Sequence, residues 1–268
     1  MPEHVIIREV CLRDGLQLED PIPLSAKLEL LEAIVATGVQ EIEATAFVSP
    51  SKVPALADAP ELAAALSAFP DVEFSALVAG AGGAGRSTAL IADIVSLAHA
   101  SGATAEVIIA TAWDCPFDGP TDPSRVVEIA AAALELGADR VAIADTIGTT
   151  TPRRVTDLIT SVRPAIGDLP LGAHFHNTRG AGLASAYAAV QAGVTRLDAS
   201  VGGLGGCPFA PGATGNIATE DLVYLLRDSD IATGIDLDRA IDAARVAQRV
   251  VGHELPSALL RAGDRQMG

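Results

Sequence analysis

The sequence contains very little lysine. Only Lys27 and Lys52 are present, and the chain carries a formal net charge of −16 from 34 acidic and 18 basic residues. Binding to nucleic acid depends on a basic surface that neutralises phosphates, so a nucleic-acid partner is disfavoured. A small anionic substrate needs only a local group of positive charges, which in this chain must consist mainly of arginines.

Long apolar runs and an even set of cysteines are also missing. No stretch approaches the roughly 18 apolar residues of a membrane span, so no association with a membrane is expected. The three cysteines, Cys11, Cys115 and Cys207, are far apart, which favours reduced thiols over a disulfide framework. The first residues resemble neither a secretory signal nor a transit peptide. We therefore expect a cytoplasmic location.

What is present is a repeated alternation of β-rich and helical segments. The 268 residues are 49% hydrophobic, which is enough for one large domain, and we expect it to span residues 1–268. Short β-rich runs alternate with Ala- and Leu-rich helical patterns, several of which end at a glycine. The predicted strands cover residues 5–10, 41–47, 74–79, 106–112, 140–146, 171–177 and 196–201. The predicted helices cover residues 24–37, 53–68, 87–101, 123–136, 152–165, 180–192, 219–228 and 236–251.

This alternation indicates parallel strands joined by right-handed crossovers. A doubly wound dinucleotide-binding sheet would carry a glycine-rich turn after its first strand, but the turn here is charged and contains Arg13-Asp14. Polar side chains follow many different strands, as in a barrel whose site is built from all the βα ends. We therefore predict an α/β fold of the TIM-barrel type. Only seven strands are evident, because residues 80–105 leave room for one helix after a glycine-rich stretch, so one helix–strand unit is missing there.

The sequence His174-Phe175-His176 is the clearest sign of a metal site. Alternation along a strand places both imidazoles on one face, and the carboxyl end of a barrel strand lies at the active site. Histidines that are merely hydrogen-bonded within the structure are the alternative. Two imidazoles with oxygen donors suit a divalent cation, and Mg²⁺, Mn²⁺, Co²⁺ and Zn²⁺ are all compatible with them.

Charged residues at the first two strands give a second signal. Asp14 can supply an anionic metal ligand, and Arg13 can stabilise an enolate or hold a carboxylate. A surface ion pair or a helix cap is the alternative. Glu43 lies inside an otherwise apolar strand, where a buried carboxylate needs a cation or hydrogen-bond donors. Arg13, on the neighbouring strand, can provide them.

A glycine-rich segment follows the last predicted strand and extends over residues 202–221. Its glycines allow the backbone to approach a ligand closely. The segment contains Cys207, and Asn216 lies just before a helix whose expected N-cap is Thr219. The alternative is a flexible loop in which Cys207 is an inert small apolar residue.

Five motifs occur in order along the chain, at residues 13–17 (RDGLQ), 42–50 (IEATAFVSP), 145–148 (DTIG), 174–176 (HFH) and 207–224. Together they resemble the 3-hydroxy-3-methylglutaryl-CoA (HMG-CoA) lyase family, within the DRE-TIM group of metal-dependent lyases and synthases, over nearly the whole chain. The resemblance implies a retro-Claisen cleavage of HMG-CoA, or of a related 3-hydroxyacyl-CoA. The products would be acetyl-CoA and acetoacetate or a related keto acid. A homodimer is also implied.

The resemblance assigns a role to individual residues. The implied ligands of a divalent cation, Mg²⁺ or Mn²⁺ with Zn²⁺ or Co²⁺ as alternatives, are Asp14, His174, His176 and Asn216. Arg13 would stabilise the enolate, and Cys207 would protonate it from a mobile loop that closes over the site. The residues implied in proton handling and in support of the site are His174, Glu43 and Asp145. We expect substrate contacts from Arg13, Gln17 and Arg179.

The match departs from the family pattern between residues 79 and 106, where one helix and the fourth strand are missing. Asn177 and Arg179 stand where relatives carry Asp and Tyr, and Ala46 stands where they carry Ser. An added arginine near the site can change which acyl-CoA is accepted or bind its phosphates. Two other functions stay open. One is a condensing acyltransferase of the isopropylmalate or homocitrate synthase type, which the Cys207 segment disfavours, and the other is a non-catalytic, shortened barrel.

Overall fold

The computed structural model describes residues 1–78, 83–206 and 215–265. The chain divides into two compact units. The first consists of Met1–Pro2, Gly80–Phe175 and Arg179–Leu197, and the second of Glu3–Ala79, His176–Thr178 and Asp198–Gly268. The expectation of a single domain over residues 1–268 stays a prediction.

Three parallel strands form the sheet of the second unit. They are β1 (Ile6–Glu9), β2 (Glu41–Ala46) and β3 (Glu73–Leu77), in the order β3-β2-β1. The carboxyl-terminal half of β9 (Arg196–Ala199) lies beside β1, where the amide of Val10 donates to the carbonyl of Ala199 at 2.9 Å. All six residues of β2 are buried, so the polar side chains of this strand must find partners inside the protein.

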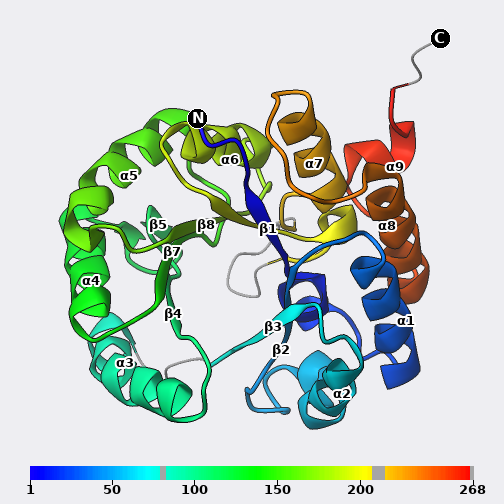
Figure 1. The fold of residues 1–268 in the computed structure, drawn as a ribbon, viewed down its shortest axis with the longest axis horizontal. Helices are drawn as coiled ribbons and strands as arrows, with labels where there is room; N and C mark the ends of the chain where they lie inside the picture. Colours follow the sequence, from blue (N-terminus) through cyan, green and yellow to red (C-terminus); the bar gives the residue numbers. More distant parts are fainter. Residues whose placement is uncertain (79–82, 207–214, 266–268) are drawn as a thin grey trace. The chain divides into compact units, whose positions relative to one another are not determined.

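The helices of the second unit are α1 (Leu24–Val35), α2 (Ala59–Ala65), α7 (Thr219–Arg227), α8 (Leu237–Val251) and α9 (Ala258–Ala262). The helices α1 and α8 lie side by side (Figure 1). The leucines and isoleucine of α1 pack in one core with three alanines of α8, whose small side chains allow close approach of the two helices; these residues are Leu30, Leu31, Ile34, Ala243, Ala244 and Ala247. Shorter helical turns are η1 (Cys11–Gly15), η2 (Leu16–Leu18), η3 (Pro54–Leu56), η4 (Leu66–Ala68) and η5 (Val201–Gly203).

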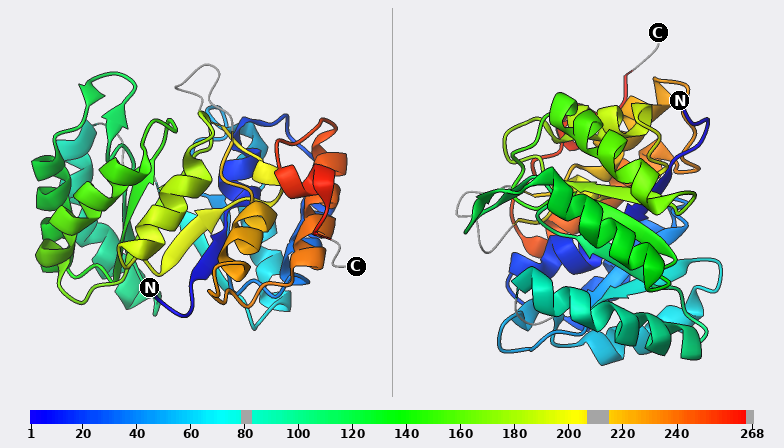
Figure 2. Two further views of the ribbon diagram at one scale, coloured as in Figure 1. Left: turned by 90° about the horizontal axis from the view of Figure 1, so that it is seen from above. Right: turned by 90° about the vertical axis from the view of Figure 1, so that its left-hand side faces the viewer.

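The first unit repeats the strand–helix pattern. Its strands β4 (Glu106–Ile109), β7 (Arg140–Asp145) and β8 (Leu171–Phe175) pair in parallel in the order β4-β7-β8. The helices α3 (Gly83–Ala100), α4 (Pro123–Glu135), α5 (Pro152–Ile166) and α6 (Gly182–Gln191) follow one another around the outside of these strands (Figure 1). A two-stranded antiparallel ribbon, β5 (Asp114–Cys115) with β6 (Gly119–Pro120), extends beyond the carboxyl ends of β4 and β7 (Figure 2, left).

The seven predicted strands and eight predicted helices all have counterparts in the described residues, and most ends differ by a few residues. The exception is the helix predicted over residues 53–68, where only α2 is α-helical and the short turns η3 and η4 flank it. Sequence periodicity missed the β5–β6 ribbon, the helix α9 and the turn η1, because each is too short to show a period. The chain between β3 and β4 contains the helix α3 and no further strand in the described residues. The prediction that one helix–strand unit is missing here is therefore confirmed. Within the glycine-rich stretch, α3 begins at Gly83, and residues 79–82 lie outside the described part of the chain.

Among the residues that the structure describes, no helix is both long and apolar enough to cross a membrane.

Candidate functional site

The turn after β1 brings two charged side chains into the interior of the second unit. The chain leaves β1 through the single π-helical turn η1, in which the amides of Arg13, Asp14 and Gly15 all donate to the carbonyl of Val10 at 2.8–3.1 Å. Both Arg13 and Asp14 are buried. Gly15 is tightly packed, because an added Cβ atom would lie 3.1 Å from Ser200 Oγ, and Ser200 would have to shift by a few tenths of an ångström to admit it.

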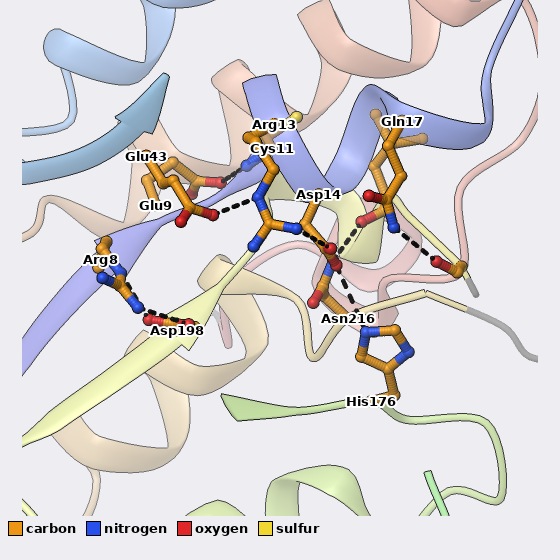
Figure 3. A network of polar contacts seen from close by, with 12 residues as sticks. Arg8, Glu9, Cys11, Arg13, Asp14, Gln17, Glu43, His176, Asp198 and Asn216 are labelled. Carbon is orange, nitrogen blue, oxygen red and sulfur yellow. Dashed lines mark hydrogen bonds and ion pairs between the residues drawn. The ribbon is translucent and has the colours of Figure 1, made fainter. Parts of the chain in front are cut away.

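Arg13 pairs with two carboxylates (Figure 3). Its Nε donates to Glu43 Oε2, and its Nη1 donates to Asp14 Oδ1 at 2.5 Å. Burial opposes the charge of the guanidinium, but the carboxylates of Glu43 and Asp14 outweigh this effect and raise the pKa of Arg13. The expectation that Arg13 compensates the buried Glu43 is confirmed, and Arg13 is a permanent cation with a fixed orientation.

A second buried ion pair lies beside Arg13, and the sequence analysis missed it. Arg8 Nε and Nη2 donate to the two carboxylate oxygens of Asp198, each at 2.9 Å (Figure 3). The two residues are 190 positions apart. The sequence signal is that β1 and β9 each contain charged residues among apolar ones, and this does not show that the two strands are neighbours. The carboxylate of Asp198 also contributes to the raised pKa of Arg13.

Three of the four predicted metal ligands meet in the second unit. His176 Nε2 lies 3.4 Å from Asp14 Oδ2, and Asn216 Nδ2 donates to the same Asp14 oxygen at 3.0 Å (Figure 3). The backbones of His176 and Asn216 form a β-bridge, and the amide of Asn177 donates to the carbonyl of Gly215 at 3.0 Å. His176 and Asn216, which are far apart in sequence, are therefore fixed side by side by the backbone.

The chemistry of these donors fits a divalent cation. A carboxylate, an imidazole and an amide oxygen are all ligands for such ions. The side-chain oxygen of Asn216 is buried and accepts no hydrogen bond within the described residues, although Asn216 Nδ2 donates to both Asp14 Oδ2 and the carbonyl of Leu204. A buried acceptor of this kind normally has a partner, and a bound cation would provide one.

The fourth predicted ligand, His174, is a buried residue of β8 in the first unit. It lies two positions before His176, and alternation along an extended chain puts the two side chains on the same face.

Two of the predicted site residues organise the loop after β7, in the first unit. Asp145 is buried, and its two carboxylate oxygens accept hydrogen bonds from the amides of Thr149 at 3.0 Å and Thr150 at 2.9 Å. The exposed Arg179 donates through Nη1 to the carbonyls of Ile147 at 2.9 Å and Gly148 at 3.1 Å. Both side chains thus fix the shape of residues 145–150.

The remaining two predicted residues concern the glycine-rich segment. Gln17 Nε2 donates to the carbonyl of Gly206 at 3.4 Å (Figure 3). Gly205, with φ of 131°, packs so closely on Asn216 that a Cβ atom would lie 2.6 Å from Asn216 Nδ2. Cys207 lies outside the described residues.

The sequence analysis also missed two buried carboxyl groups near the site. Glu9 and Glu220 are almost fully buried, and their hydrogen-bond donors within the described residues are neutral backbone amides and hydroxyl groups. Burial raises the pKa of Glu9 to about 8 and the pKa of Glu220 to about 7. The sequence signal that indicates Glu43 is an acidic residue within a mostly apolar strand. The same signal is present at Glu9 and could have identified it as a buried carboxyl group.

Comparison with known proteins gives one family and several close relatives. Residues 83–247 match the HMGL-like family. The (R)-citramalyl-CoA lyase of Chloroflexus aurantiacus is 37% identical and is aligned over 97% of this chain and 95% of that protein. The HMG-CoA lyase of Bacillus subtilis superposes with a TM-score of 0.92 at 31% identity, over 97% of this chain and 98% of the other. An HMG-CoA lyase of Acinetobacter baumannii, in complex with coenzyme A and 3-methylmalate, gives 0.88 at 34% identity, over 97% and 95% of the two chains.

These similarities confirm the predicted fold class, which is an α/β fold of the TIM-barrel type with seven strands. The alignment with the Chloroflexus protein spans 302 positions, whereas this chain has 268 residues. The relative therefore contains residues that this chain lacks, as expected if one helix–strand unit is missing.

Proposed function

This chain belongs to the HMGL-like family and is an acyl-CoA lyase, and we propose that it cleaves HMG-CoA or a related 3-hydroxyacyl-CoA to acetyl-CoA and a keto acid. The observation that carries the proposal is the buried group in which Arg13 pairs with Glu43 and Asp14, and Asp14 in turn contacts His176 and Asn216. It combines a fixed cation with a set of donors for a divalent metal.

The ligands in this proposal are Asp14, His176, Asn216 and His174, and the ion is Mg²⁺ or Mn²⁺, with Zn²⁺ and Co²⁺ as alternatives. When bound, such an ion supplies Lewis-acid polarisation of the substrate's hydroxyl and carbonyl oxygens. Asp14 Oδ2 and His176 Nε2 already lie 3.4 Å apart. The two side chains therefore lose little conformational freedom when they bind an ion.

Arg13 supports the change of charge in the reaction. The tertiary hydroxyl of the substrate loses its proton, for which His174 and Glu43 are the proposed acceptors. The bond between C2 and C3 then breaks, C3 becomes a keto group, and the electron pair forms the enolate of acetyl-CoA. Arg13 is oriented by its two carboxylates, and its remaining N–H groups would donate to the enolate oxygen.

Cys207 completes the cleavage in this proposal. Its thiol gives a proton to C2 of the enolate, and the resulting thiolate recovers the proton released from the tertiary hydroxyl. Gln17 supports this role, because it holds the carbonyl of the preceding residue, Gly206. We also propose that Arg179 contacts the anionic groups of the acyl-CoA. Arg179 is exposed and donates to the loop that begins at Asp145.

We also propose that the protein acts as a homodimer in the cytoplasm. The support for the dimer is the family resemblance. The support for the location is the set of three widely spaced cysteines, Cys11, Cys115 and Cys207, which favours reduced thiols.

The test is release of acetyl-CoA from HMG-CoA in the presence of Mg²⁺ or Mn²⁺, with (R)-citramalyl-CoA as a second substrate. We expect metal-dependent turnover of one of the two, and a loss of at least about 100-fold in kcat for Cys207→Ala, the range of lost acid–base catalysis. Cys115→Ala is the matched control, since Cys115 is a half-buried thiol in the β5–β6 ribbon of the first unit.

The outcomes separate the alternatives. Turnover of neither substrate by folded, metal-loaded protein would contradict the lyase proposal for these substrates. Release of free CoA from acetyl-CoA and a 2-oxo acid would instead indicate a condensing transferase. Equal losses in Cys207→Ala and Cys115→Ala would remove Cys207 from the proposed mechanism.

A further inference from the structure

One buried side chain next to the site has no part in the chemistry described above. Glu9, the last residue of β1, is 1% exposed. Its Oε1 accepts hydrogen bonds from the amides of Cys11 at 2.9 Å and Val201 at 3.1 Å, and its Oε2 accepts one from the hydroxyl of Thr219 at 2.5 Å (Figure 3 shows the contact with Cys11).

Each of these three donors is the first residue of a different segment of the candidate site. Cys11 begins the turn η1, which carries Arg13 and Asp14. Val201 begins η5, from which the chain continues to Gly206 and Cys207. Thr219 begins α7, three residues after Asn216.

We propose that Glu9 is a positioning residue, whose carboxyl group holds together three segments: η1, which carries Asp14, η5, which leads to Gly206, and the start of α7, which Asn216 closely precedes. The proposal rests on the proposed function in treating Asp14, His176 and Asn216 as ligands of a divalent cation. Asp14 and Asn216 are 202 residues apart and meet in one hydrogen bond of 3.0 Å. Glu9, at the end of β1, also accepts a hydrogen bond from the start of η1 and one from the start of α7.

Glu220, in the first turn of α7, also helps to hold η5 in place. It is fully buried, and both of its carboxylate oxygens lie 3.1 Å from the amide of Gly202, the residue after Val201. The start of η5 is thus fixed by two buried carboxyl groups, one at the end of β1 and one in the first turn of α7.

The experiment compares four variants of the full chain, with Mn²⁺ as the probe and without substrate. Glu9→Ala removes all three hydrogen bonds, and Thr219→Val removes one. Glu9→Gln keeps an acceptor for the two amides and a polar group for Thr219. Asp139→Ala is the control, because Asp139 also accepts a backbone amide, that of Ala105 at 2.7 Å, but at the amino-terminal ends of β4 and β7.

We expect Glu9→Ala to raise the Kd of Mn²⁺ by about 10- to 100-fold, the usual cost of losing a group that orients metal ligands. Thr219→Val should raise it less, and Glu9→Gln should bind as the wild type does. Asp139→Ala should lower the melting temperature without changing the Kd, which separates positioning from general destabilisation. Hydrogen exchange at the amides of Cys11 and Val201 should accelerate in Glu9→Ala and not in Asp139→Ala.

Wild-type affinity for Mn²⁺ in folded Glu9→Ala would overturn the proposal. If Glu9→Ala does not fold, Thr219→Val decides, and a Kd no higher than that of Asp139→Ala would overturn it. Absence of lyase activity in a wild type whose Mn²⁺ affinity still depends on Glu9 would count against the proposed function alone. A wild type that binds no Mn²⁺ would remove the metal site and the role of Glu9 with it.

Discussion

Buried acidic side chains near the site have two kinds of partner. Glu43 and Asp198 each face an arginine, which compensates their negative charge inside the protein. Glu9 and Glu220 accept hydrogen bonds from backbone amides and from the hydroxyl groups of Thr219 and Ser257, respectively. Burial therefore dominates for this second pair, and it raises the pKa of Glu9 to about 8 and that of Glu220 to about 7.

This difference predicts the dependence of stability on pH. The raised pKa means that folded protein keeps the Glu9 proton between about pH 4.5 and pH 8, where the unfolded chain has lost it. The contribution of the Glu9 proton to the stability of the folded state is therefore fully present below pH 4.5. This contribution is lost as the pH rises through about 8. From pH 5 to pH 9, the free energy of unfolding of the wild type should fall on the order of 4 kcal/mol more than that of Glu9→Gln.

Urea unfolding of the metal-free protein at the two pH values provides the measurement, with a chelator present so that cation binding does not contribute. Glu128→Gln is the control, since Glu128 lies on the exposed side of α4 and should behave as the wild type. The same pH dependence in wild type and Glu9→Gln would contradict the raised pKa of Glu9.

At the scale of elements, the β5–β6 ribbon is joined to the loop that follows β7. Asp114, at the start of the ribbon, accepts hydrogen bonds from Arg154 Nη1 at 2.8 Å and Nη2 at 3.1 Å, and from Thr149 Oγ1 at 2.6 Å. These contacts, led by those of Arg154, hold the pKa of Asp114 below its ordinary value. Trp113 packs against Phe175 and donates to the carbonyl of Arg154. The ribbon therefore helps to fix the loop that contains Asp145.

A double-mutant cycle of Asp114→Ala and Arg154→Ala should give a coupling energy of about 1 kcal/mol, because the pair is bidentate but partly exposed. The measurement is urea unfolding followed by fluorescence of Trp113, the single tryptophan of the chain. The matched control is the exposed pair Arg125–Glu128 on α4, for which we expect a coupling energy close to zero. Equal coupling in the two pairs would show that the ribbon is not held by Asp114.

At the scale of the whole molecule, binding of a cation should be linked to folding. The proposed ligands come from segments that are distant in sequence: η1, the residues after β8, and the chain before α7. The unfolded chain does not bring them together, so an ion that binds them stabilises the folded state by mass action.

We expect Mn²⁺ to raise the melting temperature. At a Mn²⁺ concentration of 100 times the Kd, binding should stabilise the folded state by about 2.7 kcal/mol. Asp14→Asn should abolish this increase. His253→Ala should retain it, because His253 is an exposed histidine that pairs with Glu19. Calorimetric scans with and without a chelator measure the effect, and an unchanged increase in Asp14→Asn would place the ion elsewhere.

The amino-acid sequence alone predicts the seven parallel strands and the long helices, and it predicts ten of the residues assigned to the candidate site, although not Arg8, Asp198, Glu9 or Glu220. Hydrophobic periodicity and helix-ending glycines depend on neighbours along the chain, so they can be read without the fold. The pairing of Arg13 with Glu43 was also within reach, because both residues belong to consecutive strand units, β1 and β2, that pair directly. The absence of one helix–strand unit followed from counting the same segments.

Which distant residues meet depends on the fold and cannot be predicted from local sequence. Arg8 pairs with Asp198 because β9 lies beside β1, and Thr219 reaches Glu9 from 210 residues away. Strand order and register determine these contacts, and local propensity does not contain them. The same holds for Asn216, whose place beside Asp14 and His176 depends on a β-bridge between two loops. A hydrogen bond between distant segments can form only after the fold has brought its donor and acceptor together.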